Sequence, residues 1–222
     1  MIRWLALFLL IPALAQAQDY VTSEGRLSDE DFYKTVACSA PVGGACVDPI
    51  VRWAPADATD LTIGITETRA GFPESTKPHV KEAIRAAIKE INGAGAALRL
   101  RFVAADEDPH ITVHLWDQGE GDTIRGMGLK QANGSILGAA YVHIWWNGDK
   151  ELTRGVIIVA RDIEKDDLRS VMLEEITQAM GLLTDIDNPW YDTRSILSEN
   201  TNWVIALQPQ DKMALRRHYP HP

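Results

Sequence analysis

Apolar and polar residues alternate in several short stretches of the chain, which is the pattern of a strand with one buried face. Leu61, Ile63 and Ile65 show it most clearly, because threonine or glycine follows each of them. Other stretches alternate in the same way or form a short apolar run. We therefore expect strands at residues 61–66, 98–102, 111–115, 139–146 and 155–160.

Two longer stretches repeat their apolar residues every three or four positions, as an amphipathic helix does. The first lies between Thr76 and Gly93, and the second covers residues 166–183. Shorter helices are expected near residues 28–36 and at residues 209–218. This order of strands and helices predicts an α/β domain.

The remaining segments set the limits of that domain. Residues 18–58 are mostly irregular, and we interpret them as an N-terminal extension that packs on a main domain at residues 59–222. Residues 117–138 are rich in glycine and polar residues, and long loops of this kind often carry function. Asn147 and Gly148 lie between two expected strands and suit a turn.

The composition is that of a globular protein, with 45% hydrophobic and 24% charged residues in a chain of 222. Acidic residues outnumber basic ones by 31 to 22, and the formal net charge is −9. Phosphate binding needs clustered Lys and Arg, and the sequence has no such basic block. We therefore expect no nucleic acid among the partners.

The first residues have the three parts of a secretory signal peptide. Arg3 precedes a short apolar run, and Ala15 and Ala17 form an A-x-A cleavage site. The run is shorter than the about 20 apolar residues that span a membrane. Gln18, rather than a cysteine, would begin the mature chain, which disfavours a lipid anchor. We expect a signal peptide at residues 1–17, a periplasmic or extracellular location, and no transmembrane anchor.

The chain has two cysteines, Cys38 and Cys46, which flank a short loop containing Pro41 and two glycines. An oxidising compartment favours a disulfide between them, and the loop has the residues that a tight turn needs. Loop closure of this length stabilises a fold by roughly 2.5 kcal/mol. Two free thiols are the alternative.

Residues 172–185 resemble the active-site helix of the metzincin zinc peptidases, whose pattern is H-E-x-x-H-x-x-G-x-x-H. Glu175 falls on the family's catalytic base, and Gly181 falls on the glycine at which the chain bends. The three ligand histidines are replaced by Glu174, Gln178 and Thr184. The E-E-x-x-Q form also resembles an uncharacterised family of secreted bacterial proteins with a domain of unknown function.

Two further stretches resemble the matrixin branch of the metzincins. Ser195, Ile196 and Leu197 take the place of the Ser-Ile/Val-Met turn, and residues 207–219 are similar to the closing helix. The resemblance covers about residues 60–220. It implies a five-stranded, mostly parallel twisted sheet with two long helices and a short C-terminal helix.

The substituted positions make a poor zinc site. Zinc prefers sulfur and nitrogen donors, and the substituted positions offer one carboxylate, from Glu174, and two weak neutral oxygens, from Gln178 and Thr184. Without a metal, Glu175 has no polarised water to deprotonate. We therefore expect no cofactor and no ordinary zinc-peptidase activity. Alternatively, the helix carries only an ordinary solvated face, formed by Glu174, Thr177, Gln178 and Gly181.

Other residues offer metal donors of a different kind. His114 and His143 lie on expected strands and are candidate replacement ligands for zinc. Asp185, Asp187 and Asp192 supply the oxygen donors that calcium prefers, although the loop lacks the glycine of an EF-hand. A solvated acidic loop is the plainer interpretation.

The function that follows is a secreted metzincin-like protein that binds a peptide or protein in the former substrate cleft. In matrixin-like folds, the peptide pairs with an edge strand, which here would be residues 139–145. Tyr141, His143 and Trp145 would share one face of that strand and line the groove. One alternative is an active hydrolase with an unusual Glu/Gln metal site, and another is an envelope scaffold.

Overall fold

The computed structural model describes residues 20–221, so the expected signal peptide at residues 1–17 lies outside the described part. The helices are α1 (Asp29–Cys38), α2 (Pro55–Ala58), α3 (Lys77–Asn92), α4 (Leu168–Gln178) and α5 (Pro209–His218). The strands are β1 (Tyr20–Thr22), β2 (Arg52–Trp53), β3 (Leu61–Thr68), β4 (Leu100–Phe102), β5 (Ile111–Leu115), β6 (Ala140–Trp146), β7 (Glu151–Val159) and β8 (Asp185–Asp187). The predicted α/β class is confirmed.

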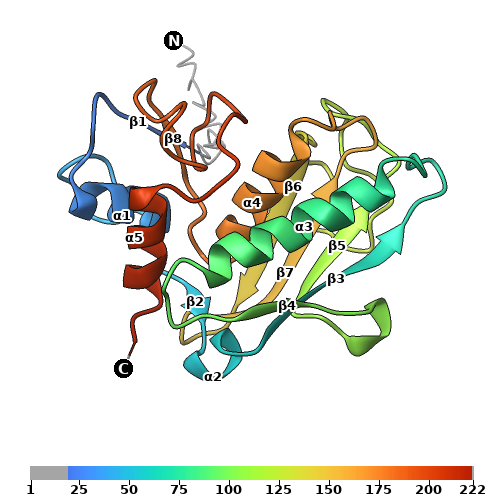
Figure 1. Ribbon diagram of the computed structural model, residues 1–222, viewed down its shortest axis with the longest axis horizontal. Helices are drawn as coiled ribbons and strands as arrows, with labels where there is room; N and C mark the ends of the chain where they lie inside the picture. Colours follow the sequence, from blue (N-terminus) through green and yellow to red (C-terminus); the bar gives the residue numbers. More distant parts are fainter. Residues whose placement is uncertain (1–19, 222) are drawn as a thin grey trace, which may run out of the picture.

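The main sheet is built around β7. β2 and β5 pair with successive parts of one edge of β7, and the sheet continues from β5 to β3 and β4 (Figure 1). All of these pairs are parallel. β6 pairs with the other edge of β7 in the antiparallel direction. Within the described residues, β6 is therefore an outer strand of a mostly parallel sheet.

The main sheet is covered on both faces. α3 and α4 lie side by side across one face (Figure 1), where Ile157 and Val159 of β7 join the large hydrophobic core. Val156 and Ile158 point to the opposite face and pack in a smaller cluster with the loop of residues 117–138. Burial on both faces explains why the second half of β7, from Gly155 to Val159, is a continuous apolar run in the sequence.

Two helices from distant parts of the sequence meet beside this sheet. α1 packs against α5, and both contribute side chains to the large core (Figure 1). β1 and β8 form a separate two-stranded parallel sheet. The predicted disulfide between Cys38 and Cys46 is confirmed, and it closes the loop that follows α1.

A buried aspartate joins the Ser-Ile-Leu turn to the last helix. The Oγ of Ser195 donates a hydrogen bond to Oδ1 of Asp211 at 2.6 Å, and the N–H of Ile196 donates to Oδ2 at 3.2 Å. Asp211 lies in the first turn of α5 and is fully buried, and Leu197 is also buried. Burial raises the pKa of Asp211 to about 6.

The structure corrects the predicted elements in three places. β2 makes the main sheet six-stranded rather than five-stranded, and with two residues it is too short to show alternation. β7 begins at Glu151, before the predicted start, because the turn at Asn147 and Gly148 lets it pair with β6 along its length. α4 is shorter than the helix predicted at residues 166–183.

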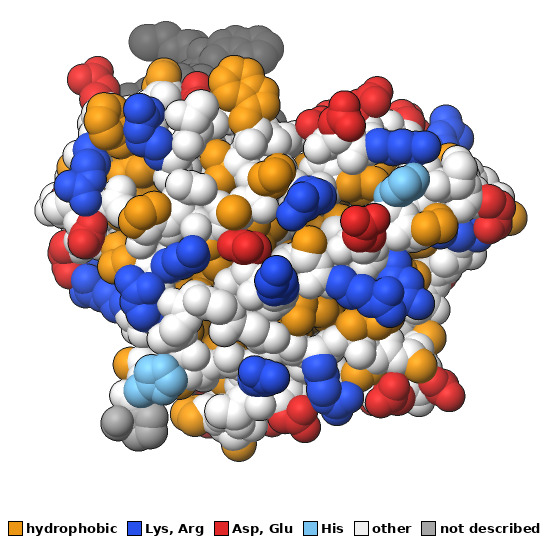
Figure 2. Space-filling view, in the orientation of Figure 1, with side chains coloured by type: hydrophobic (Ala, Val, Ile, Leu, Met, Phe, Trp, Pro, Cys, Tyr) orange, Lys and Arg blue, Asp and Glu red, His pale blue; other side chains and the backbone are white. Residues whose placement is uncertain are grey.

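The outer surface of α3 is polar. Its exposed residues include Lys81, Glu82 and Arg85, and Figure 2 shows basic side chains mixed with acidic ones where this helix crosses the molecule. No helix in residues 20–221 is long and apolar enough to cross a membrane.

Candidate functional site

A cleft of about 340 Å³ lies between the outer strand β6 and helix α4. Eight residues line it: Ala140, Tyr141, Val142, His143, Glu175, Gln178, Leu183 and Asp185. Four of them are consecutive in β6. Because side chains of a strand alternate between its faces, the cleft runs along the edge of the strand rather than over one face.

Glu175 is the most unusual group in this cleft. Its side chain is buried, with 8% of the residue exposed, and its Oε2 atom has no hydrogen-bond partner among the described residues. Burial, with a smaller effect from the nearby charge of Asp185, raises the pKa of Glu175 to about 8. At neutral pH the carboxyl group is therefore mostly protonated and neutral.

Glu174 belongs to the same acidic group. Its pKa lies well above the ordinary value, mainly because of burial and then because of the charges of Asp185, Glu175 and Glu199. These four residues come from α4, from β8 and from the segment after β8. The fold therefore gathers four acidic side chains, of which Glu175 and Asp185 line the cleft.

The chain returns to the helix after a bend at Gly181, where φ is 96°. Only glycine adopts this backbone conformation at low cost, and a Cβ at this position would overlap the carbonyl oxygen of Val51. The bend brings β8 against the end of α4. There the Nε2 of Gln178 donates hydrogen bonds to both carboxylate oxygens of Asp185, at 2.9 and 3.0 Å.

Thr184 is not brought to this cleft. Its hydroxyl lies 2.8 Å from the hydroxyl of Ser39, and its N–H donates to the carbonyl oxygen of Val36. The sequence motif placed Thr184 at the third ligand position, but the residue that returns to Gln178 is Asp185. Sequence reasoning missed this pair, as well as the contribution of Glu199. The sequence did offer one signal for Asp185, because this acidic residue directly follows Thr184, the expected third ligand position.

The residues at the motif do not fit the zinc site of a metzincin. Gln178 directs its amide nitrogen to Asp185, and Thr184 is turned toward Ser39. Among residues 20–221, no three His, Cys, Asp or Glu side chains are arranged so that they could hold a metal ion. We therefore derive no chemical step through zinc.

The candidate replacement ligands are separated in the fold. His143 lines the cleft, and burial lowers its pKa. His114 lies on β5, where Nδ1 is 3.0 Å from Oε2 of Glu67 and Nε2 is 3.1 Å from the hydroxyl of Thr112. The structure does not bring these two histidines into one site.

The aspartates proposed for calcium are also divided. Asp187 and Asp192 both accept hydrogen bonds from Nδ2 of Asn200, at 3.4 Å. Asp192 also accepts a hydrogen bond from the hydroxyl of Ser198. Asp185 is instead engaged by Gln178 in the cleft. Asp187 and Asp192 therefore share a partner in Asn200, whereas Asp185 is held separately by Gln178.

Two of the three aromatic and histidine side chains expected on the edge strand line the cleft. They are Tyr141 and His143, and both are partly buried. Trp145 does not line it, although its ring lies 4.4 Å from the ring of His143 in an edge-on contact. Tyr141 and Trp145 also pack against the smaller hydrophobic cluster, which holds them in place.

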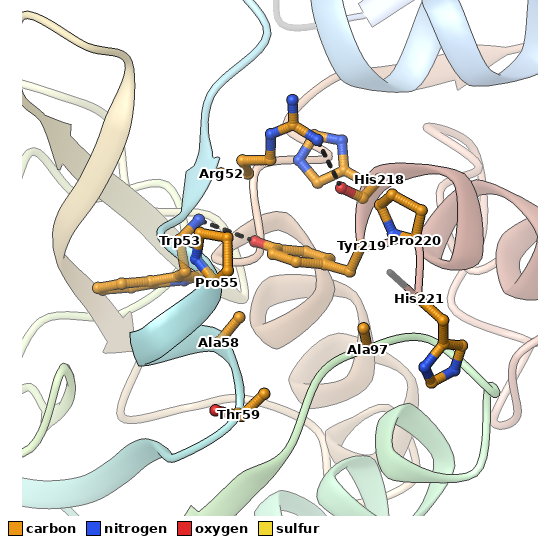
Figure 3. Close-up of a pocket in the computed structure, with 10 residues that line it drawn as sticks. All are labelled: Arg52, Trp53, Pro55, Ala58, Thr59, Ala97, His218, Tyr219, Pro220 and His221. Carbon is orange, nitrogen blue, oxygen red and sulfur yellow. Dashed lines mark hydrogen bonds between the residues drawn. The ribbon is translucent and has the colours of Figure 1, made fainter.

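A second hollow of about 410 Å³ lies at the C-terminal end of the chain (Figure 3). The hydroxyl of Tyr219 accepts a hydrogen bond from the N–H of Trp53 and donates one to the carbonyl oxygen of Met180. The ring nitrogens of His218 contact the Tyr33 hydroxyl and the Val51 carbonyl oxygen. Because these polar groups are used internally, the acidic cleft is the stronger functional candidate.

Comparison with known protein families gives a match over most of the chain. The model of a family described as "Protein of unknown function (DUF2927)" matches residues 29–221. The matched region begins with α1 and includes the disulfide loop, the main sheet, the cleft and α5. No match is found among curated proteins.

Proposed function

This chain belongs to the DUF2927 family, and we propose that it is an exported, metzincin-like binding protein without ordinary zinc-peptidase activity. It holds an extended peptide, or an extended segment of a protein, in the cleft between β6 and α4. The disulfide fits an oxidising compartment outside the cytoplasm. The bend at Gly181 supports the metzincin-like arrangement, as does the buried Ser-Ile-Leu turn.

The observation that carries this proposal is the outer edge of β6. Among the described residues, β6 pairs only with β7, and the cleft follows its other edge over Ala140, Tyr141, Val142 and His143. An open strand edge presents backbone donors and acceptors, and proteins usually blunt such an edge with proline or lysine. β6 contains neither residue. An extended peptide can add to it as a further strand.

The groups on α4 favour binding over hydrolysis. A general base must be ionised at the working pH, whereas Glu175, with a pKa of about 8, is mostly protonated at pH 7. In this state its carboxyl group can donate a hydrogen bond to a peptide carbonyl oxygen. The amide nitrogen of Gln178 already donates a hydrogen bond to Asp185. Glu175, which lines the cleft and has an unpartnered oxygen, is therefore the group of α4 that we expect to contact a bound peptide.

Selection from a random heptapeptide phage library tests this proposal. Peptides that bind the purified protein are synthesised and then methylated at one backbone nitrogen at a time. Strand pairing engages every second residue of the peptide, so methylation should weaken binding at alternate positions by roughly tenfold and have little effect between them. This test leaves the protein unchanged, so misfolding cannot imitate the result.

Two results would overturn the proposal. One is the recovery of no binding peptide, or of peptides whose methylation shows no alternation. The other is cleavage of the selected peptides, detected by mass spectrometry and abolished in Glu175→Gln. Cleavage of that kind would favour the alternative of an active hydrolase.

A further inference from the structure

We infer that the cleft selects peptides carrying an arginine or lysine side chain, whose cationic group lies between the carboxyl groups of Glu175 and Asp185. This inference rests on the proposed function, and it names the class of peptide that the cleft prefers. It draws on the position of these acidic groups, on an unsatisfied carboxyl oxygen and on the charges that surround them.

The acidic groups lie where a side chain of the bound peptide can reach them. Glu175 and Asp185 line the same cleft as the open edge of β6. Glu174 and Glu199 stand close enough for their charges to act on one another, since Asp185, Glu175 and Glu199 all contribute to the raised pKa of Glu174. The acidic group at and near the cleft therefore comes from several segments of the chain.

Glu175 supplies an independent sign that a ligand belongs here. More than nine-tenths of this residue is buried, it lines the cleft, and its Oε2 atom has no hydrogen-bond partner within residues 20–221. Buried polar atoms in folded proteins nearly always have a partner, so an exception calls for an explanation. A donor carried by a ligand would satisfy this atom.

The missing partner is best supplied by a cation. Neither Glu174 nor Glu175 forms an ion pair with Lys, Arg or His in the described part of the chain. The charged groups that act on Glu174 are themselves acidic. A ligand that carries a cationic donor would supply the hydrogen bond that Oε2 of Glu175 lacks.

Arginine and lysine side chains have the shape that this position needs. Their aliphatic stems can pack against apolar walls such as Ala140 and Leu183, while the charged end reaches the carboxyl groups. The planar guanidinium of arginine can also donate two parallel hydrogen bonds to one carboxylate. An acidic or purely apolar side chain would leave Oε2 of Glu175 without a donor.

The test uses the heptapeptides selected from the phage library. Their sequences should be enriched in arginine and lysine at one position. Replacing that arginine by citrulline keeps its shape and removes its charge, and replacing lysine by norleucine removes the ammonium group. Either replacement should weaken binding to the purified protein by about tenfold or more, the loss expected for a hydrogen bond to a charged group.

Two protein variants test whether the preference for a basic peptide depends on Glu175. Glu175→Gln should lose most of the preference for the charged peptide while keeping its affinity for the citrulline peptide. Glu164→Gln makes the same substitution at an exposed residue outside the cleft and lowers the overall negative charge, so the preference should survive. A preference that is equal in both variants would assign it to the overall negative charge and overturn the inference.

The two proposals fail in different ways. If peptides bind with the alternating response to methylation but show no enrichment in basic residues, or no loss with citrulline, the cationic preference is wrong and strand addition stands. If the library yields no binding peptide, the proposed function fails, and the inference fails with it.

Discussion

Replacing Glu175 by glutamine should remove a large part of the pH dependence of stability. In the folded protein, burial raises the pKa of Glu175 from the ordinary value of 4.5 to about 8. The folded protein therefore holds this proton more tightly than the unfolded chain does. The stabilisation is complete below the unfolded pKa, and it is lost as the pH rises from there through the folded pKa.

The size of the effect follows from the two pKa values. One pKa unit corresponds to about 1.36 kcal/mol, so the native protein should lose roughly 3.5 kcal/mol of its free energy of unfolding through Glu175 between pH 5 and pH 8. The glutamine side chain is similar in shape and does not titrate. Glu175→Gln should therefore be more stable relative to the native protein at pH 8 than at pH 5, by about that amount.

The measurement is urea unfolding of both proteins at a series of pH values, followed by circular dichroism. The difference between the two proteins at each pH is the quantity of interest, because the titration of distant groups then cancels. Glu164→Gln provides a matched control at an exposed residue and should follow the native curve. Parallel curves for Glu175→Gln and the native protein would refute the argument, since they would mean that this carboxyl group is ionised in the fold.

Two further predictions concern the segments that support the cleft. Gly181→Ala should lower the free energy of unfolding by about 3 kcal/mol or more, because the new Cβ meets both a left-handed backbone and the carbonyl oxygen of Val51. Gly43 also has a positive φ but lies in open space, so Gly43→Ala should cost only about 1–2 kcal/mol. Equal losses of stability in thermal unfolding would contradict the packing argument. Changing Cys38 and Cys46 to serine together should lower the free energy of unfolding by about 2.5 kcal/mol, because the unfolded chain is then no longer closed into a loop. If the double variant and the native protein melt at the same temperature under non-reducing conditions, the disulfide does not contribute to stability.

The sequence pattern was sufficient for most of the elements. The strand at residues 61–66, the two strands around Asn147 and Gly148, and the C-terminal helix at residues 209–218 all appear in the structure. Each has a local signal, either alternation, a turn dipeptide or a helical period. β2 has no such signal, because two residues cannot show a period, and it exists only through its pairing with β7.

The candidate site was predictable only in part, for a related reason. Glu175 and Gln178 lie three residues apart on one helix, and helical spacing alone places them on a shared face. The position of Asp185 depends on the path of the chain after Gly181, which is decided by contacts with α1 and β1 rather than by local pattern. The raised pKa of Glu175 was likewise hidden, because it arises from burial in the assembled fold.

The contact between Gln178 and Asp185 explains how the cleft keeps its shape at a motif that lacks the histidine ligands. The amide nitrogen of Gln178 joins the helix to the segment after the glycine bend by donating to both oxygens of the Asp185 carboxylate, and a hydrogen bond to a charged group contributes about 1.5–3 kcal/mol. The segment is also held by the bond between Thr184 and Ser39 and by the pairing of β8 with β1. These contacts fix the position of Asp185 in the cleft, so less conformational freedom would be lost in the peptide binding that we propose.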